Sequence, residues 1–213
     1  MAIVPGNTSA LATNNSFGSK SLSHNSNGDF IVLSIVSGAS TGTPSSVKYG
    51  TDNMTLATSK TSGNGKVWIY YLYSPSSGSN NFTYTISIGD SNAAFGLSLT
   101  GVIESSPVGQ TGSDSSSPVS TTLTSLESDS IVIDCFQGVK TSPSTPVPGA
   151  GQTVIGRSFG NTFYMHGSSY KLHGSASTTM SWSGTFNYWA AQAVTEIKAK
   201  YNPEKANVIF MFS

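Results

Sequence analysis

The acidic residues are the first candidates for chemistry, because glycoside hydrolases usually act through two opposed carboxylates. Most of the ten Asp and Glu residues adjoin turn residues, where a carboxylate caps or hydrogen-bonds the backbone. Only Asp134 and Glu196 fall within runs that we expect to be strands. We therefore expect no catalytic pair and no enzyme. A glycan-cleaving enzyme is the third hypothesis, which assays of Asp134→Asn and Glu196→Gln variants would test.

The three histidines do not have the spacing of a zinc site, which needs convergent ligands. His166 and His173 are seven residues apart, so they would lie on opposite faces of a flat strand. Together with His24 they are expected to be solvated or edge residues. The single cysteine, Cys135, lies in an apolar run and is expected to be a buried small hydrophobe without a disulfide.

Other ligand motifs are incomplete. Oxygen-rich turns at residues 52–53 and 90–92 contain ligand types that calcium prefers, but neither has a full ligand set. Turn formation explains these residues better. We therefore expect neither a metal nor a cofactor.

Aromatic side chains are the best candidates for a ligand-binding surface; they are Trp68, Tyr70, Tyr164 and Tyr188. Trp68 and Tyr70 alternate with apolar neighbours, so if those neighbours face the core, these two rings point the other way. Exposed aromatics on a sheet stack on sugar rings or bury against a neighbouring subunit. The alternative is that a long loop, such as residues 105–120, covers both rings.

The run that positions two of these rings, residues 66–74, is the densest aromatic and β-branched stretch of the chain. Asn64 and Gly65 precede it, and Pro75 follows it. Turn residues at both ends of a run of this length predict a strand rather than a helix. Because both of its faces are apolar, we place it near the centre of a sheet.

Similar runs recur along the chain. Residues 30–36 are almost continuously apolar, and residues 82–88 alternate apolar with polar side chains, as a strand with one wet face does. About a dozen short strands without a helical period predict an all-β fold, a two-sheet antiparallel sandwich of jelly-roll type. Residues 130–136 echo residues 29–36, but one echoed strand is too short to predict a repeat.

The expected organisation has an N-terminal arm or irregular edge at residues 1–27, a β-sandwich domain at residues 28–198, and a C-terminal arm strand at residues 199–213. Residues 105–120 are rich in Ser, Gly and Pro and could mark a domain boundary. We prefer a long loop, because each half alone offers too few strands to close a sandwich.

The composition excludes some classes of partner. Charged residues make up 9% of the chain and the formal net charge is zero, so the chain lacks the basic surface that nucleic-acid binding requires. No apolar run approaches the roughly 20 residues of a transmembrane helix, so we expect no membrane insertion. Residues 1–12 lack the basic start and the apolar centre of a signal peptide.

Several stretches together resemble an all-β domain that recurs in large extracellular bacterial proteins and in phage particle proteins. Their order and spacing carry the resemblance over residues 19–198; the stretches are residues 28–36, 46–50, 54–55, 67–75, 99–102, 106–107, 149–152, 180–182 and 189–197. The resemblance implies a jelly-roll-like module for surface display, adhesion or particle building, and it implies no activity. The short chain, which begins at Met1 without a leader, favours a virion component over a secreted adhesin.

The leading hypothesis is therefore a non-catalytic structural protein on the surface of a virus-like particle, such as a head decoration, a capsid-associated protein or a fibre subunit. Its expected partners are further copies of itself and a capsid or other particle protein. The alternative is an extracellular carbohydrate-binding or adhesion module that recognises surface glycans. The expected location is accordingly the virion surface or the extracellular space.

The end of the chain is predicted to be an assembly arm. A charged spacer interrupted by Pro203 leads to a uniformly apolar segment, which consists of Val208, Ile209, Phe210, Met211 and Phe212. A free apolar end of this kind invites edge-strand pairing, so we expect it to be buried. It either forms an edge strand of its own sheet or adds to the sheet of a neighbouring subunit, and both alternatives remain open.

Overall fold

The computed structural model describes residues 1–14, 18–38, 42–87, 91–139, 145–160, 163–172, 176–184, 186 and 189–200, excepting the side chains of residues 12–14 and 159–160. The described residues form seventeen β-strands and no helix. Each pair of neighbouring strands is antiparallel. The prediction of an all-β antiparallel fold is confirmed, but the described residues form four sheets instead of two.

The first half of the chain forms two facing sheets. The first inner sheet has the strand order β1-β9-β3-β7-β6, and the first outer sheet has the order β2-β8-β4-β5. The strands are β1 (Val4–Asn14), β2 (Gly18–Ser26), β3 (Phe30–Ser37), β4 (Ser45–Tyr49), β5 (Asp52–Asn53), β6 (Thr55–Ser62), β7 (Gly65–Tyr73), β8 (Gly78–Ile86) and β9 (Ser91–Thr100). Residues 1–27 thus carry two strands, of which β1 pairs with β9 and β2 pairs with β8.

The second half forms another pair of sheets. The second inner sheet has the order β10-β17-β12-β15-β14, and the second outer sheet has the order β11-β16-β13. The strands are β10 (Val108–Asp114), β11 (Val119–Thr124), β12 (Ile131–Val139), β13 (Val147–Pro148), β14 (Thr153–Gly160), β15 (Tyr164–Leu172), β16 (Ser177–Ser183) and β17 (Ala190–Ile197). Residues 105–120, which we expected to be a long loop, contain β10 and the start of β11.

The two halves repeat one topology. The strands of the two inner sheets correspond one to one in their order across the sheet: β1, β9, β3, β7 and β6 match β10, β17, β12, β15 and β14. The outer sheets correspond in the same way, with β2, β8 and β4 matching β11, β16 and β13. The echo between the sequences of β3 and β12 therefore reflects a duplicated fold, and the expectation that one half has too few strands for a sandwich is wrong.

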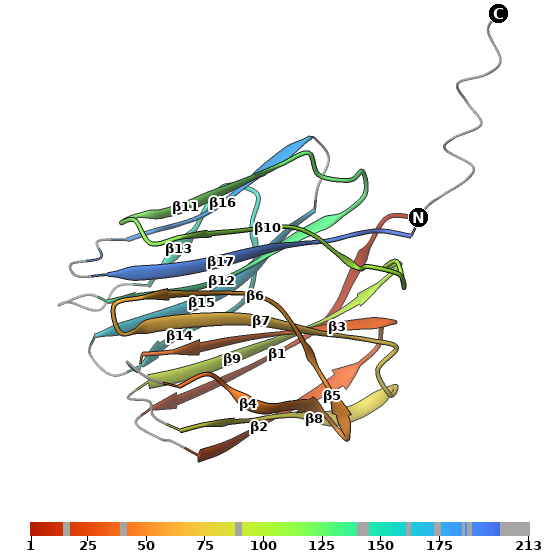
Figure 1. The fold of residues 1–213 in the computed structure, drawn as a ribbon, viewed down its shortest axis with the longest axis horizontal. Helices are drawn as coiled ribbons and strands as arrows, with labels where there is room; N and C mark the ends of the chain where they lie inside the picture. The colour runs from red at the N-terminus through yellow and green to blue at the C-terminus, as the bar shows by residue number, and fades with distance from the viewer. Residues whose placement is uncertain are drawn as a thin grey trace, which may run out of the picture.

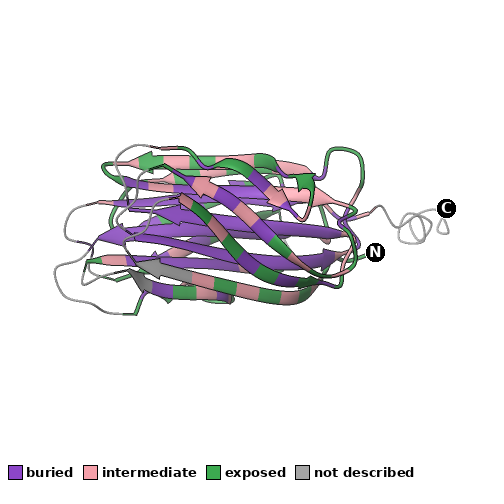
Figure 2. Cartoon of the chain, turned by 90° about the horizontal axis from the view of Figure 1, so that it is seen from below, coloured by how far each residue is buried: buried purple, intermediate pink, exposed green. Residues whose placement is uncertain are grey.

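The four sheets are stacked as layers (Figure 1), and buried residues run in continuous stretches along the inner strands (Figure 2). The two inner sheets pack on each other through the largest apolar cluster, which includes Phe95, Leu97, Ile133 and Ala193. A second cluster joins the first inner and outer sheets, and two smaller clusters join the second inner and outer sheets. Inner strands such as β3 and β12 are therefore buried on both faces, which explains why their sequences are almost continuously apolar.

One end of the stack holds both ends of the described chain and the connection between its halves. Val102 in this connection forms a β-bridge with Ala199. The Met1 amino group donates a hydrogen bond to the Lys200 carbonyl at 3.0 Å, and the Lys200 ammonium lies 2.9 Å from a carboxylate oxygen of Asp29. We call this the junction end. The opposite end, where β6 turns into β7 and where β15 and β17 begin, we call the loop end.

Candidate ligand-binding site

Asp134, one of the two carboxylates inside expected strands, accepts four hydrogen bonds in the core between the second inner and outer sheets. One of its oxygens accepts from the Ser169 backbone at 2.9 Å and from the Ser169 hydroxyl at 2.7 Å. The other accepts from the Trp182 indole at 2.6 Å and from the Gln192 amide at 2.9 Å. Complete burial raises the pKa of Asp134 to about 6 despite these donors. Asp134 therefore ties its own strand to three others.

Glu196, the other carboxylate, is also buried. Its two oxygens accept hydrogen bonds from the backbone amides of Glu127 at 2.7 Å and Gln110 at 3.0 Å. Asp134 lies opposite Val194 on the neighbouring strand, two residues before Glu196 along β17. The two carboxylates thus lie on the same face of the sheet. Asp134 accepts hydrogen bonds from a backbone amide and three side chains, and Glu196 accepts hydrogen bonds from two backbone amides.

His24 is buried, which contradicts the expectation of a solvated or edge residue. Its ring links the first outer sheet to the first inner sheet. Nδ1 lies 3.0 Å from the Ser9 hydroxyl, and Nε2 lies 2.8 Å from the Ser98 hydroxyl. Burial lowers the pKa of His24 to about 4, so the ring is neutral at pH 7 and both nitrogens have a hydrogen-bond partner.

His166 is buried between the two inner sheets, again in contrast to the expectation. Its ring lies between the hydroxyls of Ser158, at 3.1 Å from Nδ1, and Ser91, at 3.4 Å from Nε2. Burial lowers the pKa of His166 to about 3. His173 lies outside the described residues. Cys135 is buried, as predicted.

The aromatic residues chosen from the sequence fall into different environments. Trp68 and Tyr70 are only 4% and 6% exposed, because the first outer sheet covers them. The expectation that they point to solvent is therefore wrong, and the cover is a sheet rather than residues 105–120. Tyr164 is half-buried at the loop end, and Tyr188 lies outside the described residues.

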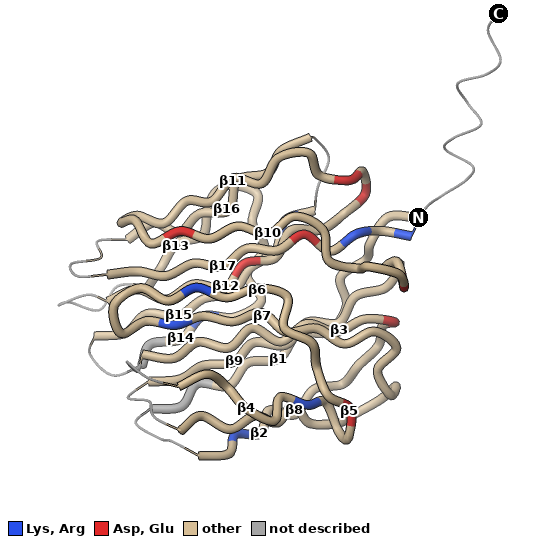
Figure 3. Tube along the Cα trace, viewed as in Figure 1, with Lys and Arg blue, Asp and Glu red and all other residues tan. Residues whose placement is uncertain are grey.

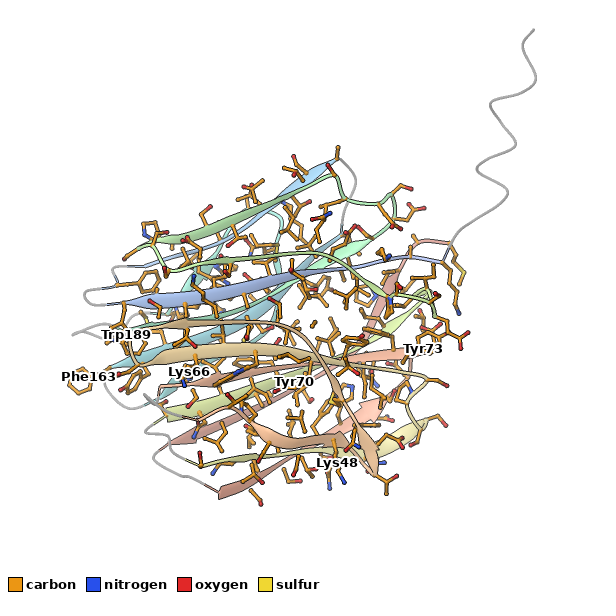
Figure 4. The ribbon with its side chains drawn as sticks, viewed as in Figure 1. Lys48, Lys66, Tyr70, Tyr73, Phe163 and Trp189 are labelled. Carbon is orange, nitrogen blue, oxygen red and sulfur yellow. The ribbon has the colours of Figure 1, made fainter. Side chains whose placement is uncertain are left out.

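A different group of rings gathers at the loop end, and Figure 4 labels two of its members, Phe163 and Trp189. Trp189 precedes β17, and its ring centre lies 6.1 Å from that of Tyr164 at an interplanar angle of 47°. Phe163 precedes β15, is 51% exposed and points away from the sheets (Figure 4). We call Phe163, Tyr164 and Trp189 the aromatic patch.

Backbone contacts and two glycines hold the aromatic patch in place. The Trp189 carbonyl accepts a hydrogen bond from the Val139 amide at 3.1 Å, at the end of β12. The Trp189 ring lies on the turn between β6 and β7, where a Cβ on Gly63 or Gly65 would come within 2.8 Å or 2.2 Å of it. A side chain at either glycine would displace the ring.

Gln137 lies beneath the aromatic patch and is fully buried. Its Oε1 accepts a hydrogen bond from the Lys66 backbone amide at 3.1 Å. Its Nε2 is buried and has no hydrogen-bond partner among the described residues. Gln137 Oε1 and the Trp189 ring both approach the position of a Cβ on Gly65, so the amide lies close to the ring. A buried donor without a partner is costly, and this one lies below the surface, since Gln137 is fully buried.

Sequence reasoning missed most of this group. Trp189 is not among the aromatic candidates chosen from the sequence, and it lies immediately before β17, which begins at Ala190. Its place just before a strand was the signal that it belongs to an end of the sandwich. Neither Phe163 nor Gln137 had such a signal, because their neighbours in space come from distant parts of the chain.

Comparison with known proteins identified no relative: no family model, no curated protein and no solved structure matches the chain. Within the described residues, no three His, Cys, Asp or Glu side chains are grouped closely enough to hold a metal ion. In the same part of the chain, no helix has the length and apolar character needed to cross a membrane.

Proposed function

We propose that this protein is a non-catalytic structural protein of a particle surface, built from two fused jelly-roll units. In the first half, β1-β9-β3-β7 faces β2-β8-β4-β5, and β5 continues into β6 after one residue. This alternation of strands between two sheets supports the jelly-roll assignment. The second half has the same order with a shorter outer sheet. Jelly rolls are frequent in capsid proteins.

The observation that carries the proposal is the fusion of the two units through their inner sheets. This packing buries the central part of one face of each inner sheet and leaves the outer sheets on the outside of the stack (Figure 1). Most exposed residues of these outer strands are uncharged and polar, with Asp52 and Val147 as exceptions; the polar ones are Ser19, Ser21, Ser23, Asn25, Ser45, Ser46, Asn53, Ser79, Asn81, Ser120, Thr122, Thr124, Ser177, Thr179 and Ser183. Charged residues are sparse on the strands (Figure 3). A rigid body with neutral, hydrogen-bonding faces suits repeated packing on a particle.

The buried polar groups support the same proposal. Asp134, Glu196, His24 and His166 all form hydrogen bonds within the protein. Their geometry is that of residues that hold sheets together.

Sedimentation velocity over a wide range of protein concentrations tests the proposal. We expect an oligomer, and we expect it to dissociate when residues 207–213 are deleted if these residues form an intermolecular arm. These residues lie outside the described part of the chain, so the arm remains a prediction. A full-length protein that stays monomeric at all concentrations, and that binds no particle isolated from its host, would contradict the proposed function.

A further inference from the structure

β1 is the longest strand of the described chain and lies at the edge of the first inner sheet, where it pairs only with β9. From Thr8 to Asn14 its register with β9 is unbroken. The other side of this stretch carries backbone groups that point away from the sheet. Within the described residues, no backbone hydrogen bond from a turn, loop or other sheet reaches them. β1 therefore presents a regular open edge of seven residues.

β1 also lacks the charged side chains that usually protect a sheet edge from pairing. Most of the other edge strands have such protection, because β2 contains Lys20, β6 contains Lys60 and β14 contains Arg157. β10 ends at Asp114, and β5 and β13 are only two residues long. β11 is uncharged, but it has six residues and its Ser120 amide is bound to Asp114 at 2.7 Å. β1 is therefore the longest unprotected edge.

We propose that β1 accepts the apolar segment 207–212 of a second copy of the chain as an additional antiparallel strand. Main-chain hydrogen bonds to the open edge provide the pairing, and alternate side chains provide burial. Thr8 and Ala10 of β1 are exposed and lie opposite Leu97 and Phe95, which belong to the core between the inner sheets. The added strand extends the border of this core. The inference rests on the proposed function, because it names the surface that the predicted assembly arm binds.

The length of the arm identifies the occupant as a neighbouring copy. All described strand pairs are antiparallel. An antiparallel partner of β1 must begin at the loop end, near Asn14, which is about 34 Å along the strand from Val4. Lys200 lies beside Met1 at the junction end, and residues 201–206 span at most about 22 Å. The arm of the same copy therefore does not reach Asn14, whereas the arm of a copy whose junction end faces this loop end does.

The charges of the two ends agree with this head-to-tail arrangement. Most acidic residues of the described chain lie towards the junction end (Figure 3). Glu104, in the connection at this end, is exposed. Neither Glu104 nor Lys66 at the loop end has an ion-pair partner within the described residues. Opposite charges on facing ends guide two copies into contact. Because the two contacting surfaces differ, such contacts lead to a ring or a filament instead of a closed dimer.

Disulfide cross-linking between full-length chains locates the arm. An Ala10→Cys chain and a Met211→Cys chain are mixed in equal amounts and oxidised. In the register that aligns the start of the arm with the end of β1, Met211 lies opposite Ala10, so we expect a disulfide-linked heterodimer on a non-reducing gel. A chain with both substitutions should give a ladder of linked chains. Thr122→Cys, at an exposed position of the edge strand β11, is the matched control and should not cross-link to Met211→Cys.

A charge on the open edge tests the same contact without a cross-link. We expect Thr8→Lys to weaken self-association at least tenfold in sedimentation velocity, because Lys on an edge strand opposes pairing. Ser79→Lys adds the same charge at an exposed position of β8, which is paired on both sides, and should leave association unchanged. Melting curves show that each variant is folded.

The inference is supported if Met211→Cys cross-links to Ala10→Cys of another chain, and if Thr8→Lys weakens association while Ser79→Lys does not. It is overturned if the arm cross-links to Thr122→Cys, if the double variant closes its disulfide within one chain, or if Thr8→Lys has no effect. In these three cases an oligomer of the full-length protein still supports the proposed function. A protein that stays monomeric at all concentrations overturns the inference, and it contradicts the proposed function if it also binds no particle from its host.

Discussion

Asp134 is the side chain with the most hydrogen bonds in the core of the second half, and its substitution by Asn is a direct test of that role. The Asp134→Asn change replaces one acceptor oxygen by an NH₂ group, which would face the donors of Ser169 or those of Trp182 and Gln192. We expect the free energy of unfolding to fall by about 2–4 kcal/mol, because buried donors lose their acceptor. Urea unfolding measures this change. Asp52→Asn, at an exposed position of the short strand β5, is the control, and an equal effect there would refute the role of Asp134.

The two buried histidines predict that the protein loses stability in acid. The pKa of each ring is lower in the folded state, at about 4 for His24 and about 3 for His166, than the usual 6.5. The unfolded state therefore binds more protons, and the stabilisation present above about pH 6.5 is lost as the pH falls towards 4 and then 3. Each ring should cost about 1–2 kcal/mol by pH 5.

Asp134 acts in the opposite direction. Its pKa is raised to about 6, so the folded state takes up a proton before the unfolded state does. This contributes about 1 kcal/mol of stability as the pH falls from 7 to 5, less than the two histidines remove. Unfolding free energies at pH 7.5 and pH 5 check the sum. The His24→Gln variant should show a shallower pH dependence than the natural protein, and an unchanged slope would be evidence against this account.

At the scale of the elements, both halves place a large aromatic ring between the inner and the outer sheet, but the ring comes from the inner strand in the first half and from the outer strand in the second. Trp68 on β7 lies opposite Ile35, and the equivalent position on β15 is Gly167, opposite Phe136. In the second half, Trp182 comes from the outer strand β16 and stacks on Phe136 at 5.4 Å. A large ring on the inner strand has thus been replaced by a ring from the outer sheet, and Gly167 leaves room for it.

Gly167→Ala tests this exchange of side chains. A Cβ at Gly167 would lie 2.6 Å from the Trp182 ring, so the ring or the strand must shift. We expect a loss of about 1–3 kcal/mol, the usual cost of overpacking. Thermal or urea unfolding measures it. Ser120→Ala, on an exposed position of β11, should change stability by less than about 0.5 kcal/mol, and a similarly small effect of Gly167→Ala would show that the fit is loose.

At the scale of the whole molecule, the two halves should unfold together. Their inner sheets share one core, and Phe95 of the first half packs on Gly156 of the second, where an added Cβ would lie 2.3 Å from the ring. Phe95→Ala should therefore lower the stability of both halves by about 3–5 kcal/mol. Hydrogen exchange read separately on β3 and β12 checks this. Two separate unfolding transitions, or a loss of protection confined to β3, would mean that the halves are independent domains.

The local structure of the strands follows from the amino-acid sequence. Alternation in residues 82–86 placed Phe82, Tyr84 and Ile86 in a core, and the structure buries all three. The two apolar faces of β7 indicated an inner strand, and β7 lies between β3 and β6. These properties depend on side-chain periodicity, which is local, so they could be read directly.

Which sheet covers which face depends on the packing of the layers. The alternation of side chains in β7 predicts that Trp68 and Tyr70 point away from the core between the inner sheets, where they could be exposed. The first outer sheet buries both rings instead, because the pattern of a strand shows that a face is apolar but not which element packs on it. The duplicated topology could not be recognised from the sequence for the same reason. Leu33 and Asp134 hold equivalent positions, but one side chain is apolar and the other is charged, since each contacts its own partners across the core. The candidate site likewise brings Gln137 and Trp189 together from distant strands, a proximity that arises only when the sheets stack.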